Sequence, residues 1–480
     1  MAKKQIDKKL TAIWYFYLNN NMWLSVTLDE IKKLAISKEL IVESIDEVEF
    51  GYMPKIKAVL LKTNLGSALY PRQKLEEIEL YNKNIKPNQN YENFWSSVDW
   101  FLPAFIENGK ISSAINQSNI NVLNHKQLST EVLQKDFEHS LTSIYDFSNI
   151  IPITEQTLSK SKTISKHVPL IREAMFAFYS GMKIVAISSL IPIVENIIST
   201  IIEAHDSELT IIDKVNKCLD KANDEVIKMH INHADWIPPE YLEISVLKVM
   251  NERVFMLELI RNWLLNSFYA KTKTYKNHSG FNRHIFAHAK SDLWQNPSNF
   301  FRAMGVIQAM AFIECFTVQG SQLSLLPPSH DEKSESLRQE VFACLNFQVI
   351  KKQLIVNQQI SNNLPFNTTS SDDGWSTRAT ILSEKMNNEI VKKLRNNNWD
   401  CHIISDPIKD GEYITVEAKK EGDFLKVALL YSCASSNKLY KYLEESFDYI
   451  LYQGASFKQE SYAYNVDTII RPLNAWLAPE

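Results

Sequence analysis

The sequence predicts a mostly α-helical protein that ends in a small α+β domain. Only 11 of the 480 residues are glycine, against an average usage of about 7%, which argues against a glycine-looped nucleotide fold. Apolar residues recur with a helical period through the middle of the chain, and three strand-like runs gather in the last hundred residues. Four parts are predicted: a mixed, mainly helical N-terminal region (1–150), a helical bundle (151–321), linkers with a helix (322–376) and the α+β domain (377–480).

The composition limits the class of protein. Apolar residues make up 45% of the chain and charged residues 22%, as in ordinary folded proteins. The formal net charge is -4, so an RNA partner would need a local basic patch. The N-terminus lacks the apolar segment of a signal peptide, and no run of about 20 apolar residues is present, so we expect no membrane partner.

The number and spacing of the cysteines indicate the redox environment of the protein. The five are far apart and form no C-x-x-C pair, which predicts reduced, buried thiols and a cytoplasmic location. They are Cys218, Cys315, Cys344, Cys401 and Cys433.

In the N-terminal region, residues 3–21 read as an aromatic-rich helix. Core packing is the expected role of the aromatic run from Trp14 to Tyr17. Thr27-Leu28-Asp29-Glu30 is the signature of a capping box that opens a second helix. Residues 46–62 contain β-branched residues and are expected to pair as strands.

The middle of the chain has the clearest helical period. Helices are predicted on both sides of Gly181, and the apolar stretch 182–202 is expected to be a buried core helix, since Pro192 and Glu195 interrupt it. Further helices are predicted at about 209–230 and 238–268, then a short helix at 281–290. A long apolar helix is predicted to run through Phe316, with Ser298 as its N-cap.

The C-terminal part changes character after a polar linker. The predicted order is α-β-β-β-α, which is typical of a small α+β domain and also suits a double-stranded RNA-binding domain, although the basic loop expected there is not evident. The predicted elements are a helix at 335–358 and then, in the domain itself, a helix at 377–396, strands at 401–404, 413–418 and 425–431, and a helix at 437–453.

One segment stands out chemically: Asn282-Arg283-His284-Ile285-Phe286-Ala287-His288. On a helix, His284 and His288 share a face, whereas Arg283 lies about 140° from His288. Arg283 would therefore reach the same point through its long side chain or from a partner subunit. Free N–H groups at the start of this helix would also favour an anion such as phosphate.

These residue types suit cleavage of a phosphodiester. Histidine titrates near neutral pH, so it can take a proton from an RNA 2′-hydroxyl or give one to the leaving oxygen. Arginine can hold two phosphate oxygens and stabilise the charge that develops in the transition state. This set requires neither a metal nor a cofactor. The spacing alone is weak evidence, because an arginine and a histidine near a helix start are more often a cap or a surface ion pair.

The segment resembles the signature of the HEPN superfamily (higher eukaryotes and prokaryotes nucleotide-binding), an arginine followed by a polar residue, three variable residues and a histidine. It is most similar to the "LNRHxxLHG" form of bacterial proteins linked to phage defence. The helix–Gly–helix around Gly181 and the P-x-x-E step from Pro192 to Glu195 also fit that subgroup. The likeness covers residues 165–318. It departs from the subgroup at Ala289, where a glycine is usual.

The resemblance implies a helical bundle that dimerises and cleaves RNA without metal, with two motifs at one shared cleft. It implies that Arg283 and His288 are the catalytic pair. His284 then matches the variable polar position, Asn282 precedes the motif, and Glu195 is a possible supporting residue. An anti-phage or toxin-like role follows from the same resemblance, and so does the alternative of an inert bundle that serves as a sensor or dimerisation scaffold.

Other constellations leave alternatives open. Glu417-Ala418-Lys419 resembles the E-x-K of PD-(D/E)xK nucleases, with Asp406 upstream, and would suit a Mg²⁺-dependent nuclease. The same strand pattern is typical of a solvated sheet face, which is the stronger interpretation. Lys271, Lys273 and Lys276 form a modest basic cluster that either guides RNA or is an ordinary loop.

His230-Ile231-Asn232-His233 has the spacing of two metal ligands. No glutamate or cysteine pair lies nearby, so a turn at the end of a helix is expected.

Overall fold

In the computed structural model the chain forms two compact units. Unit 1 consists of Met1–Ile171 and Ile187–Arg338, and unit 2 of Arg172–Ala186 and Gln339–Glu480. The predicted class is confirmed, since the chain is mostly helical with a small α+β region at its C-terminal end. The structure describes residues 2–19, 25–118, 120–122, 128–202, 208–273, 275–288, 292–361, 375–408, 411–432, 435–453 and 463–480.

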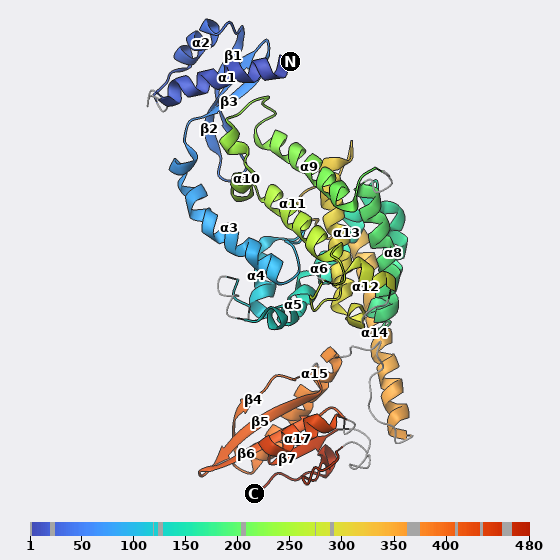
Figure 1. Ribbon diagram of the computed structural model, residues 1–480. Coiled ribbons are helices and arrows are strands. Elements are labelled where there is room, and N and C mark those ends of the chain that lie inside the picture. Colours follow the sequence, from blue (N-terminus) through green and yellow to red (C-terminus); the bar gives the residue numbers. More distant parts are fainter. Residues whose placement is uncertain are drawn as a thin grey trace. The chain divides into compact units, whose positions relative to one another are not determined.

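The described helices follow the sequence order shown in Figure 1. In the first half they are α1 (Ala2–Asn19), α2 (Leu28–Ser37), α3 (Glu79–Ser97), α4 (Asn108–Gln117), α5 (Thr130–Ile144), α6 (Phe147–Pro152), α7 (Val168–Tyr179) and α8 (Lys183–Ile201). In the second half they are α9 (Ile211–His230), α10 (Ile244–Met250), α11 (Glu252–Trp263), α12 (Arg283–His288), α13 (Ser298–Thr317), α14 (Glu332–Ser361), α15 (Trp375–Lys385), α16 (Lys392–Asn396) and α17 (Asn437–Ser446).

The N-terminal strands β1 (Val42–Phe50), β2 (Ile56–Thr63) and β3 (Gly66–Pro71) form an antiparallel sheet in that order, so the expected strand pairing is confirmed. The sheet is extended by a distant segment, because the N–H of Leu69 donates to the Trp236 carbonyl at 2.8 Å. Buried side chains from residues 231–250 also join its core. The first seventy residues therefore share one core with a segment that follows α9.

One local prediction in this region is confirmed, and the predicted core packing of the aromatic run is confirmed for two of its four residues. Thr27 and Glu30 form the capping box of α2, with the Thr27 N–H donating to the Glu30 carboxylate at 2.7 Å. Trp14 and Tyr17 are buried in the core, as their helical spacing predicts. Tyr15 and Phe16, between them, are about half exposed.

The predicted helix at 238–268 is wrong at two points, because extended backbone at Glu243 and at Asn251 interrupts it. Asn251 has φ -143° and ψ 106°, which is extended backbone between α10 and α11. Its side-chain oxygen accepts from the N–H of Arg253 at 3.0 Å, and its side-chain amide lies 3.2 Å from Nδ1 of His230. The asparagine thus caps α11 and holds the end of α9, and both contacts require it to leave the helix.

Helix α13 is the core helix of unit 1 and packs against α5 and α9. It contains buried polar residues as well as apolar ones, and each charged member has a partner. The Glu314 carboxylate accepts from the Ser161 hydroxyl at 2.6 Å and from the Lys162 N–H at 2.7 Å. The prediction that Ser298 is the N-cap is wrong: the helix begins at Ser298, whose N–H donates to the Asn296 side chain at 3.2 Å.

Two described helices, α8 and α13, are long and apolar enough to cross a membrane by length and composition. In α13, 89% of the relevant window is buried inside the protein, whereas in α8 the share is 44%. Helix α8 therefore buries one face only, so the expectation of a buried core helix at 182–202 holds for that face and not for the other. The predicted break at Gly181 is confirmed, since α7 ends at Tyr179 and α8 begins at Lys183.

In unit 2 the strands form one five-stranded sheet with a helix layer on each face. The order is β4-β5-β6-β7-β8, with β7 parallel to β6 and β8 parallel to β7. Buried residues of α15 and α16 pack on one face and those of α17 on the other. The strands are β4 (Asp400–Ile404), β5 (Tyr413–Lys420), β6 (Asp423–Leu430), β7 (Tyr449–Tyr452) and β8 (Arg471–Pro472).

The predicted helix at 437–453 is wrong at its end. Helix α17 stops at Ser446, Phe447 takes an extended conformation, and β7 follows. Among the cysteines that the structure describes, Cys218 and Cys401 are buried as predicted, whereas Cys315 and Cys344 are only partly buried and correct that prediction. Cys433 lies outside the described residues.

Candidate active site

The start of α12 is fixed by Asn282, which is fully buried. Its side-chain oxygen accepts from the N–H groups of His284 at 3.0 Å and Ile285 at 3.3 Å. Its side-chain amide donates to the carbonyls of Ser267 at 2.7 Å and Ala270 at 2.9 Å. Asn282 thus ties the first turn of α12 to the end of the preceding helix, and every polar atom of its side chain is engaged.

This cap corrects one expectation about the helix start. The sequence predicts free N–H groups there that favour an anion, but those of His284 and Ile285 donate to Asn282. Helix α12 is also only six residues long. The N–H groups of His284 and Ile285 are therefore not available to bind an anion.

The chain before α12 is held by close packing. Gly280 has φ +64°, and a Cβ there would lie 2.6 Å from the Cβ of Leu293 and 2.9 Å from the Trp294 nitrogen. Glycine is thus required both by the left-handed backbone and by the approach of the next loop. Phe281 is buried against Trp263 and Phe286, with ring centroids 6.1 and 4.9 Å away.

Arg283 is the first residue of α12 and lies against two side chains of unit 1. Its Nε is 3.3 Å from Oε1 of Glu195 on α8, and its guanidinium carbon is 5.8 Å from the centre of the Tyr269 ring. The Arg283 side chain is 44% exposed and that of Glu195 33%. Burial raises the pKa of Tyr269 to about 12, while the charge of Arg283 acts in the opposite direction.

The two histidines lie near opposite ends of α12. His284 is partly exposed, and its position is set through the hydrogen bond from its N–H to Asn282. His288 is the last residue of α12, and its side chain lies outside the described residues, as does Ala289. Because residues 283–288 form a helix, His284 and His288 share a face and Arg283 is offset from His288, as the spacing predicts.

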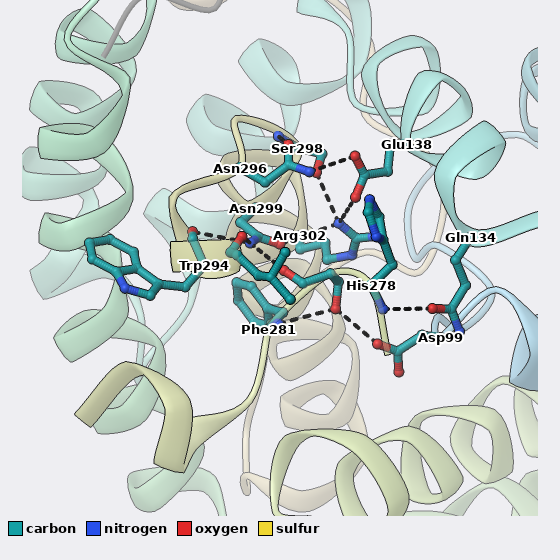
Figure 2. Close-up of polar contacts among 12 residues, drawn as sticks. Asp99, Gln134, Glu138, His278, Phe281, Trp294, Asn296, Ser298, Asn299 and Arg302 are labelled. Carbon is teal, nitrogen blue, oxygen red and sulfur yellow. Dashed lines mark hydrogen bonds and ion pairs between the residues drawn. The ribbon is translucent and has the colours of Figure 1, made fainter. Parts of the chain in front are cut away.

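A buried polar network joins α13 to the loops on either side of α12 (Figure 2). Asn299 is fully buried, and its amide donates to the carbonyls of Ser279 at 2.7 Å, Trp294 at 3.1 Å and Leu293 at 3.2 Å. It therefore joins the loop before α12 to the loop after it. Asn299 lies on α13, so the candidate site is anchored directly to the core helix.

Two buried charges complete this network (Figure 2). The Arg302 guanidinium donates to the Ser298 hydroxyl at 3.0 Å and lies 3.5 Å from the Glu138 carboxylate. Asp99 accepts from the hydroxyls of Ser279 at 2.9 Å and Tyr275 at 3.1 Å. Burial raises the pKa of Asp99, opposed by its hydrogen bonds and by the charge of Arg302.

Sequence reasoning misses this network and Tyr269. Asp99 and Glu138 lie more than a hundred residues from their partners, and no local pattern joins them. Tyr269 carries no motif either. The usable signals are the runs of polar residues inside apolar segments, such as Asn299 and Arg302 within α13, because buried polar residues require partners.

The basic cluster before α12 lies at the surface. Lys271, Lys273 and Lys276 are all exposed. Between them Tyr275 turns inward, with its N–H donating to the Lys271 carbonyl at 3.0 Å. The three lysines thus flank a buried anchor in the loop that leads to Arg283.

The alternative site in unit 2 is arranged as a solvated sheet face. Oε1 of Glu417 is 2.9 Å from Nζ of Lys426, its neighbour across the β5–β6 pair. Nζ of Lys419 lies 5.1 Å from the centre of the Phe424 ring, and Asp406 is exposed after β4. Among the residues that the structure describes, no group of three or more His, Cys, Asp or Glu side chains is placed to hold a metal ion.

The other pair with metal-ligand spacing is also separated. His230 is buried at the end of α9, whereas His233 is exposed in the turn that follows. The expected helix-end turn is confirmed.

Comparison with known proteins adds no family to these observations: no family model, no curated protein and no solved structure matches the chain.

Proposed function

We propose that the protein is a metal-independent endoribonuclease of HEPN type. The observation that carries the proposal is the rigid presentation of Arg283 at the head of α12. Asn282 fixes the helix start from within the core, and the Arg283 side chain remains 44% exposed. His284 and His288 lie on the same short helix. A charged guanidinium beside two imidazoles suits a phosphodiester.

The reaction needs only proton transfer and charge stabilisation. A histidine takes the proton of the RNA 2′-hydroxyl, and the 2′-oxygen attacks the adjacent phosphorus. The bond from phosphorus to the 5′-oxygen breaks, and a protonated histidine supplies the proton that this oxygen gains. The products are a 2′,3′-cyclic phosphate and a 5′-hydroxyl. Arg283 stabilises the negative charge on the phosphoryl oxygens in the transition state.

Glu195 gives this site a resting state. Its carboxylate holds Nε of Arg283 at 3.3 Å, so an RNA phosphate must compete with it for the guanidinium. We expect Glu195→Gln to lower the KM for RNA, because the neutral amide competes less well with phosphate. A KM that rises while kcat falls would instead mean that Glu195 orients Arg283 productively.

The first experiment measures cleavage of a single-stranded RNA in EDTA. We expect activity in EDTA, cyclic phosphate ends on the products, and no cleavage of the same sequence with 2′-deoxy sugars. Arg283→Ala and His288→Ala are expected to lose activity, with Arg338→Ala, whose side chain is 46% exposed and paired with Glu335, as the matched control. Full activity in both site variants would overturn the proposal. Cleavage that requires Mg²⁺ and is lost in Lys419→Ala would favour the nuclease of unit 2.

We further propose a homodimer whose site is shared, with Arg283 from one chain and His288 from the other. Mixing inactive Arg283→Ala with inactive His288→Ala then restores activity, because one of the two sites in the mixed dimer has both residues intact. A mixture that remains inactive, although the two variants exchange subunits, would contradict the shared site. A dimer without any RNA cleavage would favour an inert scaffold.

The biological role that we propose is anti-phage defence or a toxin-like function in the cytoplasm, with RNA as the substrate. Lys271, Lys273 and Lys276 are exposed beside α12 and would attract the RNA backbone. Expression of the wild-type chain should slow growth, and His288→Ala should relieve the effect. Equal toxicity of both chains would contradict this role.

A further inference from the structure

A pocket of about 860 Å³ lies in unit 1, away from the residues of the candidate active site. Its walls come from the β1–β2 loop, α3, the segment around α4, and the junction of α10 and α11. Pockets of about 300–1,000 Å³ are the usual size of small-molecule sites. The volume therefore suits a molecule larger than a single ring.

The floor of the pocket is apolar and partly aromatic. Trp95, Leu102, Ile111, Ile115 and Phe255 line it, and each is less than a tenth exposed. An apolar floor of this kind favours an apolar ligand surface over water.

The mouth of the pocket has a different character. Tyr52 and Tyr91 stand there and are 51% and 39% exposed. The guanidinium of Arg253 lies 5.0 Å from the centre of the Tyr52 ring, which orders this tyrosine. Asn108 and Asn116 also line the mouth and are exposed. An amide carries both donor and acceptor atoms, as does the edge of a nucleobase.

The lining is balanced in charge. Its lysine, Lys248, has Nζ 2.8 Å from both carboxylate oxygens of Glu92. Its glutamate, Glu252, accepts from the Asn108 amide at 2.5 Å. A phosphate would have to displace Glu92 from Lys248 and would lie near Glu252. The pocket therefore disfavours an anionic ligand.

We propose that this pocket binds a neutral, planar heteroaromatic molecule of nucleoside size, with its ring against Tyr52 and Tyr91 over the apolar floor and its polar edge toward the amides at the mouth. Stacking on the exposed tyrosine rings tolerates any base, while asparagine side chains select hydrogen-bonding edges. The proposal does not depend on ribonuclease activity.

The test is calorimetric titration of the full-length protein with adenosine, guanosine, cytidine and uridine at up to millimolar concentrations. At least one nucleoside is expected to bind, and its 5′-monophosphate to bind more weakly. The Arg283→Ala variant should bind equally well, which separates this pocket from the candidate active site. Absence of binding by all four nucleosides, or tighter binding of the monophosphate, would overturn the proposal.

Two neighbouring serines of α4 provide a matched pair of variants. Both serines are exposed, but Ser112 lines the pocket and Ser113 does not. We expect Ser112→Trp to fill the mouth and raise the Kd by at least about tenfold, since burial of the ligand is lost. Ser113→Trp should leave the Kd within about twofold. An equal Kd for both variants would mean that the ligand binds outside this pocket, which would refute the assignment.

A further variant tests the chemical class. Asn116→Ala removes one amide from the mouth and should raise the Kd by about twofold to tenfold, the usual effect of one hydrogen bond. Octanol provides the contrasting probe, because it is apolar and not planar. If octanol binds more tightly than every nucleoside, the heteroaromatic assignment is wrong.

Discussion

Acid should destabilise unit 1 through His230, and the structure gives the expected size of the effect. His230 is 5% exposed, and its ring meets the Phe50 ring edge-on at 5.8 Å. Burial lowers the pKa of His230 from 6.5 to about 4. Its Nδ1 lies 3.2 Å from the side-chain nitrogen of Asn251, which is a donor, so Nδ1 must be unprotonated to accept.

The sign follows from proton binding in the two states. Between pH 6.5 and about 4 the unfolded chain binds a proton at this histidine and the folded chain does not. The contribution of neutral His230 to the stability of the folded state is therefore fully present above pH 6.5 and is lost as the pH falls toward 4. A difference of about 2.5 pKa units, at about 1.4 kcal/mol each, corresponds to a loss of about 3 kcal/mol.

The measurement is urea denaturation at pH 7 and pH 4 of the wild type and of His230→Gln. Glutamine does not titrate, and its oxygen can accept from Asn251. The variant should be less stable than the wild type at pH 7, because the contact with Phe50 is lost. The free energy of unfolding of the wild type minus that of the variant should be smaller at pH 4 than at pH 7 by about 3 kcal/mol. His233→Gln, at the exposed neighbour, should follow the wild type. A gap between wild type and His230→Gln that stays constant with pH would refute this reasoning.

Three further substitutions test the support of the candidate site, each by urea denaturation with far-ultraviolet circular dichroism. Asn282→Ala removes a buried side chain that makes four hydrogen bonds to the backbone, so we expect a loss of about 2–4 kcal/mol; wild-type stability would exclude the cap as a support. Arg302→Met leaves the mostly buried Glu138 without its cationic partner, with the Asn296 amide still donating to it at 2.6 Å, and should cost up to about 3–5 kcal/mol, much of which returns in the double variant with Glu138→Leu. A double variant no more stable than Arg302→Met would count against the ion pair. Gly305→Ala places a methyl group against the Tyr145 hydroxyl in the core. The destabilisation from overpacking, about 1–3 kcal/mol, should exceed the stabilisation from the higher helix propensity of alanine, about 1 kcal/mol. A variant more stable than the wild type would show that the Tyr145 side chain shifts to make room for the methyl group.

The predicted fold succeeds where local signals decide the structure. Thr27 and Glu30 define the start of α2 because their contacts are three residues apart. It fails at the end of α17, where Leu439, Leu443 and Ile450 continue a helical pattern although the last of them lies in β7. Ile450 is opposite Ala428 in the parallel pair with β6. Pairing with a strand twenty residues earlier thus overrides the local period.

The candidate site divides in the same way. The short helix at 283–288 follows from local sequence, and its spacing sets the relation of His284 to His288. The role of Asn282 does not, because its amide donates to carbonyls that its own position does not reveal. The resemblance suggests Glu195 as a companion, and its 3.3 Å contact with Arg283 depends on the packing of α8.

The central place of α13 has a consequence for the order in which the protein is made. Its residues emerge from the ribosome after those of α5, yet Arg302 provides the charge that Glu138 faces. Glu314 is likewise synthesised long after Ser161, from whose hydroxyl its carboxylate accepts a hydrogen bond. At about 5–20 residues per second, the earlier helices wait for many seconds with their apolar faces open. We expect the nascent chain to depend on chaperones during this interval, and a fragment that stops before α13 to aggregate rather than fold.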